Sequence, residues 1–234
     1  MPRSKRDKVV ALTEVKKKGR EVKAQLIDTV RESADQFAYV WVFEVEHMRN
    51  NLLQDVRKQW QGSKIFLGRN AVMRKGLGAT VEDECRLGVS RVANLLEGNR
   101  GLLFTDEEPK VVVEWFESYK KQDFARTGNK VDETFELPQG PIKINEDLAP
   151  HSLEPQFRKL GLSTSLLKGV PTLLTPHTVC TKGDTLNPNQ VNLLKLFGKT
   201  FATFQMIPLL GIHLTDGSIA GGSIAESMDS ADAE

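Results

Sequence analysis

The chain has 234 residues, 39% of them hydrophobic and 27% charged, with a formal net charge of +1. This length and apolar content are enough for one large domain or two modest ones, each with a core. No apolar run approaches the roughly 18 residues of a membrane span, and the basic N-terminus lacks a hydrophobic stretch of signal-peptide length, so neither membrane insertion nor secretion is expected. Cys85 and Cys180 give neither a zinc motif nor a disulfide framework, which favours a reducing compartment.

The near-zero net charge hides a gradient along the chain. Residues 1–23 carry nine Lys or Arg against three acidic residues, whereas residues 215–234 carry five acidic residues and no Lys or Arg. A basic head predicts polyanion binding at one end of the chain, and its short basic clusters are compatible with nuclear import. The acidic tail is expected to be a flexible, solubilising end.

Helices and strands are predicted in alternation after the basic head. Residues 39–45 form a nearly continuous β-branched and aromatic run, typical of a strand that is buried on both faces. A helix is predicted over residues 14–37, where an apolar face is shared by Val15, Val22, Leu26, Ile27, Val30 and Ala34. Further helices are predicted over residues 52–60 (capped by Asn50 or Asn51), 69–77, 81–96 and 109–119, and further strands over residues 64–67 and 101–106. This alternation predicts an α/β fold with a parallel or mixed sheet covered on both faces.

The pattern changes near Asp123. Seven of the ten prolines fall between residues 123 and 197, among short strand-like runs, which predicts a small β-rich α+β unit. A helix is predicted from Pro188, and a strand after Gly198 then resumes the α/β pattern. An inserted domain is therefore expected, with a contiguous second domain as the alternative. The predicted division is a basic extension (1–23), an α/β domain (24–122 and 198–220), an inserted domain (123–197) and an acidic flexible tail (221–234).

No catalytic residue, metal site or cofactor is predicted. Gly198-Lys199-Thr200 ends like a P-loop, but Leu193 stands where that motif needs its first glycine. No dinucleotide-binding, nucleophile-elbow or zinc-protease motif occurs, and the four histidines are scattered without metal-ligand spacing.

A basic island is the stronger functional signal. Residues 56–81 contain no acidic residue and six basic ones, whereas solvated surfaces usually intersperse both signs. In a helix that starts near Asn70, the side chains of Asn70 and Arg74 share an outer face beside the helix N-terminus, which suits an anionic backbone. A solubilising patch with an asparagine cap is the alternative. Together with the cluster from Lys16 to Lys23, the island favours an extended polyanion, with RNA as the leading candidate.

Three motifs carry a resemblance to a known family: GRNAVMRK (68–75), RGLLFTDE (100–107) and CTKGDTLNPNQVNLLKLFG (180–198). In this order they resemble the large-subunit ribosomal stalk-base protein family in its archaeal and eukaryotic form, over about residues 16–219. The resemblance implies an rRNA-binding α/β domain with an inserted domain, bound at the factor-binding (GTPase-associated) centre beside a neighbouring large-subunit protein. The basic island and the resemblance together give the candidate RNA-binding residues Lys16, Lys17, Lys18, Arg20, Lys23, Arg57, Lys64, Arg69, Asn70, Arg74 and Lys75.

Departures from the family pattern point to a paralogous ribosome assembly factor. Ala71 replaces the family's usual threonine, only 15 residues follow Ile219, and the basic head with KKKGRE resembles that paralog. The resemblance implies a monomeric, non-enzymatic placeholder of the nucleolus and nucleus. Such a factor binds large-subunit rRNA on the precursor particle, can travel with it to the cytoplasm, and is displaced with a release factor for which a phosphatase-like protein is a candidate.

Three alternatives remain open at this stage. A genuine stalk-base protein with a shortened C-terminal region would share the motifs, and an RNA-processing enzyme would need a catalytic cluster that the sequence lacks. A protein-interaction module could use Trp41, Trp60 and Trp115, although their spacing favours core positions. The inserted domain, with no net charge over residues 123–197, is expected to meet proteins rather than RNA.

Overall fold

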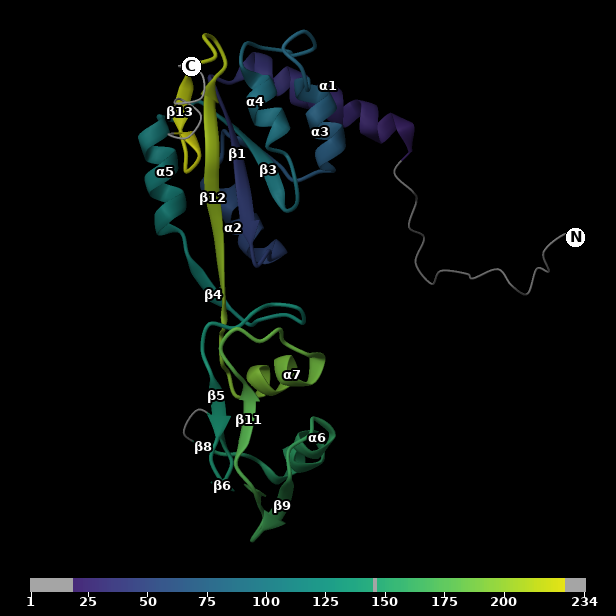
Figure 1. Ribbon diagram of the computed structural model, residues 1–234, viewed down its shortest axis with the longest axis vertical. Coiled ribbons are helices and arrows are strands. Elements are labelled where there is room, and N and C mark those ends of the chain that lie inside the picture. Colours follow the sequence, from purple (N-terminus) through teal and green to yellow (C-terminus); the bar gives the residue numbers. More distant parts are fainter. Residues whose placement is uncertain (1–18, 145–146, 226–234) are drawn as a thin grey trace, which may run out of the picture.

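The computed structural model describes residues 19–144 and 147–225. Figure 1 shows a larger part, in which helices pack on a sheet, and a smaller part built from the middle of the chain; β4 (Lys121–Asp123) and β12 (Ala202–His213) join the two. The predicted RNA contacts Lys16, Lys17 and Lys18 and most of the acidic tail lie outside the described residues.

The larger part follows the predicted alternation of helices and strands. Besides β4 and β12, its elements are α1 (Arg20–Gln36), β1 (Tyr39–Glu46), α2 (Asn50–Gln59), β2 (Lys64–Phe66), α3 (Asn70–Leu77), α4 (Val89–Asn94), β3 (Arg100–Thr105), α5 (Pro109–Ser118) and β13 (Ile219–Gly221).

The sheet is antiparallel, so the prediction of a parallel or mixed sheet is wrong. Its strand order is β13-β12-β1-β3-β2, β4 pairs with the start of β12, and every one of these pairs is antiparallel. Strands that alternate with helices usually become parallel neighbours. Here β1 and β2 are not neighbours, because β3 lies between them and runs in the opposite direction. The hydrophobic pattern identifies the strands but not which strand pairs with which.

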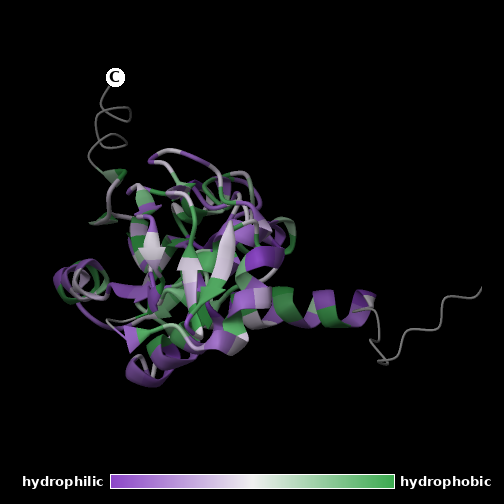
Figure 2. Cartoon of the chain, turned by 90° about the horizontal axis from the view of Figure 1, so that it is seen from below, coloured by the Kyte–Doolittle hydropathy of each residue, from purple (hydrophilic) through white to green (hydrophobic). Residues whose placement is uncertain are grey.

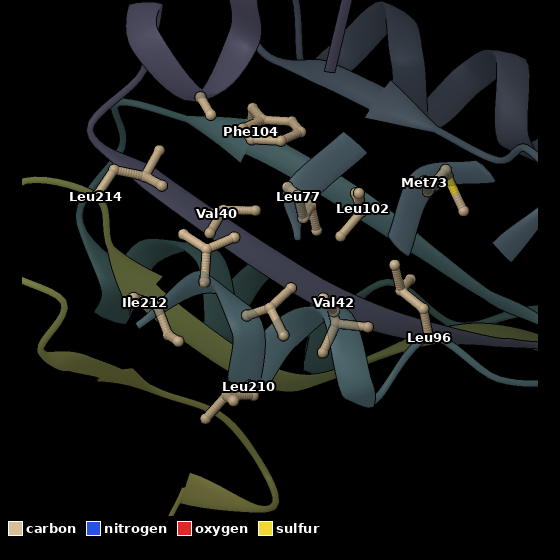
Figure 3. Close-up of a cluster of buried hydrophobic side chains, with 14 of the residues drawn as sticks. Val40, Val42, Met73, Leu77, Leu96, Leu102, Phe104, Leu210, Ile212 and Leu214 are labelled. Atoms are coloured by element: carbon tan, nitrogen blue, oxygen red, sulfur yellow. The ribbon is translucent and has the colours of Figure 1, made fainter. Parts of the chain in front are cut away.

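Helices cover both faces of this sheet. On one face α1, α3 and α4 enclose a core that includes Val40, Leu102 and Ile212, and Figure 3 shows these side chains converging between helices and strands. On the other face α2 and α5 enclose a second core around Trp41, where Trp60 is also buried. The strand β1 supplies both cores, which explains its continuous apolar run, and the prediction that Trp41 and Trp60 are core residues is confirmed.

The first turns of α1 extend beyond the sheet. Figure 2 shows this helix leaving the body of the domain with hydrophilic and hydrophobic residues side by side. Of the predicted apolar face, Val30 and Ala34 are buried, whereas Val22 is 44% exposed, so this face is not buried along its whole length. The apolar pattern continues to the start of the helix, but the sheet that buries it does not extend that far.

The predicted helix over residues 81–96 is wrong in its first half. Residues 79–88 form turns, and α4 starts only at Val89, after Gly88 in the left-handed conformation (φ 77°). The Glu84 carboxylate accepts hydrogen bonds from the backbone N–H groups of Gly88 and Ser90 at 3.1 and 3.3 Å. These local bonds compete with a continuous helix.

The asparagine cap predicted for α2 is wrong as well, because Arg49 is the N-cap of this helix and Asn50 is its first residue.

The smaller part is an insertion with its own core. It contains short strands and two α-helices: β5 (Phe135–Leu137), β6 (Gly140–Pro141), β7 (Lys143–Ile144), β8 (Asp147–Leu148), α6 (Glu154–Lys159), β9 (Thr164–Leu167), β10 (Val170–Leu173), β11 (His177–Cys180) and α7 (Pro188–Leu196). A separate cluster that includes Phe157, Leu173 and Leu194 forms its interior. After it, β12 and β13 complete the first sheet, so the β-rich region interrupts the α/β fold and a contiguous second domain is excluded.

Candidate nucleic-acid interface

The turn from β2 into α3 is built around two close approaches of α1. A Cβ on Gly68 would lie 3.0 Å from Leu26 Cδ2, and one on Gly76 would lie 3.2 Å from Val30 Cγ1. Glycine at both positions lets α1 pack tightly against the turn and against α3. Arg69 is the N-cap of α3, and no described side chain caps this helix. The tight packing brings the basic residues of α1 and of the β2–α3 turn onto one surface.

A groove of about 680 Å³ runs along the β2 edge of the sheet, where α1, α2, β2 and α3 meet. We call it the β2-edge groove; it is lined by Val22, Lys23, Leu26, Arg57, Ile65, Phe66, Leu67, Gly68, Arg69 and Val72. The exposed side chains of Lys23, Arg57 and Arg69 bring three positive charges to it from three separate elements. None of its described lining residues is acidic. The groove therefore favours an anionic ligand with an apolar portion.

Two residues of the GRNAVMRK motif are held within the protein. The Asn70 amide donates a hydrogen bond to the Gly98 carbonyl at 2.9 Å. Arg74 donates from Nε to the Ala93 carbonyl at 3.0 Å and from Nη2 to the Asn94 carbonyl at 3.2 Å. A cation at the last carbonyls of α4 complements the negative end of that helix. These contacts fix α3 against α4 and give Asn70 and Arg74 a structural role, so an RNA contact by either stays a prediction.

The other two charged positions of the motif are available to a ligand. The side chains of Arg69 and Lys75 are exposed, and neither side chain makes a hydrogen bond or an ion pair with the described residues. Lys75 lines a smaller hollow of about 320 Å³ on another side of α3, together with Arg31 and Arg74. Arg69 and Lys75 thus flank α3 rather than converging on one point, which suits an extended anion better than a single phosphate.

The remaining predicted cations divide into two kinds. Arg20 lies one helical turn before Lys23 on α1 and is exposed. Lys64, in contrast, donates to Gln36 Oε1 at 3.0 Å and lies 5.6 Å from the centre of the Phe37 ring. Within the part of the chain that the structure describes, the Arg57 side chain makes one long hydrogen bond, of 3.4 Å, to the Ile65 carbonyl. We define the cationic face as Arg20, Lys23, Arg57, Arg69 and Lys75.

The sequence analysis missed two contributors to this surface. The sequence pattern places Val22 and Leu26 on one apolar helical face and does not indicate that they line a groove. It also does not single out Arg31. Arg31 donates to the Gly76 carbonyl at 3.2 Å and lines the hollow next to Lys75. One feature of the sequence could have pointed to this surface. Val22 is an apolar residue among charged ones at the start of α1. That part of α1 extends beyond the sheet, so Val22 is not buried there.

No constellation for metal or thiol chemistry was found in residues 19–144 and 147–225. These residues contain no group of three or more His, Cys, Asp or Glu side chains arranged to hold a metal ion. Burial raises the pKa of the Cys85 and Cys180 thiols, whereas reactive cysteines need a lowered pKa. None of the described helices is both long enough and apolar enough to span a membrane.

Sequence comparisons match the division of the chain into an α/β part and an insertion. The family model described as ribosomal protein L10 matches residues 18–121, and the model for the insertion domain of the 60S ribosomal protein of this family matches residues 125–198. The chain is 45% identical to ribosome assembly factor mrt4 of Schizosaccharomyces pombe over 93% of each sequence. It is 40% identical to ribosome assembly factor MRT4 of Saccharomyces cerevisiae, over 88% of this chain and 91% of that protein.

A ribosomal protein of the same family is more distant. Large ribosomal subunit protein uL10x of Arabidopsis thaliana is 26% identical over 70% of this chain, and the match spans 50% of the plant protein. The higher identity and nearly full coverage lie with the assembly factors. The chain therefore belongs to the ribosomal protein L10 family, as a member of its Mrt4 branch of ribosome assembly factors with the family's insertion domain.

Proposed function

We propose that this chain is a non-enzymatic assembly factor that binds large-subunit rRNA at the factor-binding centre of the precursor particle. It occupies that site as a placeholder, and the mature stalk-base protein later replaces it. The observation that carries the proposal is the β2-edge groove. Three exposed members of the cationic face line it, Lys23 from α1, Arg57 from α2 and Arg69 from the β2–α3 turn, and none of its described lining residues is acidic.

The physical argument for RNA rests on how polyanions are bound. A nucleic acid releases condensed counterions when Lys and Arg neutralise its phosphates, so several cations on one surface contribute together. The five cations of the cationic face are spread over three helices and a turn, which matches a run of phosphates rather than a small ester. Family membership with uL10x, named a large ribosomal subunit protein, supports rRNA as the nucleic acid.

The placeholder role follows from two proteins of one family competing for one site. An assembly factor and a ribosomal protein that present the same α/β domain to the same rRNA exclude each other. A contact with several phosphates dissociates slowly unless the site is remodelled, so exchange requires a release factor, for which a phosphatase-like protein is a candidate. We place the action in the nucleolus and nucleus, with passage to the cytoplasm on the particle, as a monomer beside the neighbouring ribosomal protein of that centre.

A genuine stalk-base ribosomal protein is the second candidate. It would use the same face, so rRNA binding alone does not separate the two functions. The identity of 45% to an assembly factor against 26% to a ribosomal protein favours the first.

The binding test compares the full chain with a variant that neutralises three groove cations. In Lys23→Gln/Arg57→Gln/Arg69→Gln, the steepness of log affinity against log salt for the rRNA fragment of the factor-binding centre should fall by about 2–3 units, because each of the three lost phosphate contacts removes about 0.7–0.9. The matched control is Lys110→Gln/Lys120→Gln/Lys168→Gln, which neutralises three exposed lysines away from the cationic face. Equal slopes for the groove variant and the wild type, or no binding by the wild type, would refute the proposal.

A further inference from the structure

We infer that the β2-edge groove receives an unstacked base of the bound RNA, while the cations on its rim hold the neighbouring phosphates. This inference rests on the proposed function, and it specifies which part of the RNA is bound in the groove. It predicts that the RNA is not bound through its phosphate backbone alone.

The size and lining of the groove fit a nucleotide rather than a bare phosphate. Its volume of about 680 Å³ lies within the roughly 300–1,000 Å³ that is typical of small-molecule sites. Contacts to phosphates use charged and polar groups, backbone N–H included. Here the apolar side chains of Val22, Leu26 and Val72 line the same groove as the cations. Such walls are of no use to a phosphate and suit the flat face of a base.

The exposure of Val22 is not explained by the folding of the domain. Val22 is 44% exposed on a part of α1 that extends beyond the sheet, whereas Val30, two turns later, is fully buried. The helix therefore carries an apolar residue to the groove without burying it in the core. Lys23 follows it directly, so one turn of α1 offers an apolar surface and a cation side by side.

The edge strand supplies hydrogen-bonding groups at the same place. Among the described residues β2 pairs only with β3, so its other edge is not covered by a strand. An open strand edge presents N–H and C=O groups, and the edges of an unstacked base carry matching donors and acceptors. Arg57 already reaches this edge, since its Nη2 lies 3.4 Å from the Ile65 carbonyl. Apolar walls, cations and a peptide edge therefore meet in one hollow.

Charge complementarity decides against a neutral or basic occupant. Lys23, Arg57 and Arg69 contribute three positive charges, and no described lining residue opposes them. An acidic amphipathic peptide would match the same charges, but the proposed binding of rRNA favours RNA as the occupant.

The first measurement uses a matched pair of valines. Val22→Ser should lower the affinity for the rRNA fragment about five- to tenfold and leave the salt slope unchanged, because an apolar contact is lost and no phosphate contact. Val111 on α5 is 46% exposed, and Val111→Ser should change neither quantity. Both variants should keep the wild-type circular dichroism spectrum. An unchanged RNA affinity of Val22→Ser would overturn the inference.

The second measurement identifies the base. Each unpaired nucleotide of the fragment is replaced in turn by an abasic one, and binding is measured for the wild type and Val22→Ser. One abasic position should weaken the wild type by the same five- to tenfold and weaken Val22→Ser no further, as expected for two partners of one contact. Additive losses at every position would overturn the base pocket while leaving the rRNA-binding proposal intact. Absence of any binding by the wild type would instead overturn that proposal.

Discussion

The α/β part and the insertion expose different chemistry. At the β2 edge of the α/β part, exposed cations surround a groove without acidic lining residues. The insertion balances eight Lys and Arg against eight Asp and Glu over residues 123–197, and it exposes the leucines Leu148, Leu166, Leu167 and Leu174 by 48–55%. Polyanion binding needs a local excess of positive charge, and among the described residues the β2-edge groove of the α/β part shows such an excess. We therefore expect the RNA affinity to reside in the α/β part.

The two parts are also separate in their packing. The α/β part has one core on each face of its sheet, whereas the insertion has a third core of its own. Between them run the paired strands β4 and β12, braced by an ion pair of 2.6 Å between Arg49 Nε and Asp123 and by a hydrogen bond from Arg49 to the Phe124 carbonyl. Separate cores joined by two strands suggest that one part can unfold without the other.

The largest expected effect comes from emptying the core of the insertion. Phe157 is fully buried and stacks on Phe197 with ring centres 5.9 Å apart. Phe157→Ala should lower the free energy of unfolding of the insertion by about 3–5 kcal/mol. In NMR spectra, the dispersed signals of residues 125–198 should weaken while those of the α/β part persist, and rRNA affinity and salt slope should stay at the wild-type values.

The control for this variant is Leu167→Ala, at a leucine that is 55% exposed. It should change stability by less than about 0.5 kcal/mol. If Phe157→Ala lost rRNA affinity with a folded α/β part, the two regions would be coupled through the β4–β12 connection, and the separation of roles would be wrong.

The sequence predicts elements of this fold better than their pairing. The continuous apolar run of β1, the proline at the start of α5 and the change of pattern at Asp123 all have local causes, and each led to a correct expectation. The antiparallel sheet was not predicted, because the position of β3 between β1 and β2 depends on contacts between distant segments. The turns over residues 79–88 were missed because the bonds accepted by Glu84 outweigh a helical pattern.

The candidate site shows the same limit at the level of single residues. The basic island contains Arg57 and Arg69 of the surface that we propose for RNA. Spacing alone also assigns Asn70 and Arg74 to the ligand, whereas both side chains bind backbone carbonyls of the protein. Lys23 and Arg57 are far apart in sequence, and only the packing of α1 beside β2 brings them to one groove. Their charge is visible in the sequence, and their convergence is not.

An intermediate effect on stability is expected from Arg74 in the GRNAVMRK motif, which holds α4, whereas Lys75 of the same motif is expected to affect RNA binding instead. Arg74→Ala removes two charge-assisted hydrogen bonds to the end of α4, and its side chain is 35% exposed, so the free energy of unfolding should fall by about 1–2 kcal/mol. Lys75→Ala should change it by less than about 0.5 kcal/mol but lower the rRNA salt slope by about one unit. Urea denaturation and a salt series on both variants measure these quantities. Equal stability of the two variants would show that Arg74 does not anchor α4.

The smallest effect concerns the opposite edge of the same sheet, where a carboxylate organises the turn between β12 and β13. The Ser218 backbone N–H donates to Asp216 Oδ1 at 3.0 Å, and together with the Ser218 hydroxyl and the His213 ring it lowers the pKa of Asp216 from the usual 3.8 to about 2. Because the folded pKa lies below the unfolded one, the ionised group stabilises the fold above about pH 4, and this contribution disappears as the pH falls through 2.

An NMR titration of the Asp216 carboxyl carbon should have its midpoint near pH 2. In Ser218→Ala the hydroxyl donor is lost while the backbone N–H remains, so the midpoint should move only part of the way back toward 3.8. The rRNA affinity of this variant near neutral pH should match the wild type, since the turn lies at the β13 edge and the cationic face at the β2 edge. A midpoint of 3.8 in the wild type would show that the turn is not held by the carboxylate, and a loss of rRNA affinity in Ser218→Ala would show that the binding surface is not confined to the β2 edge.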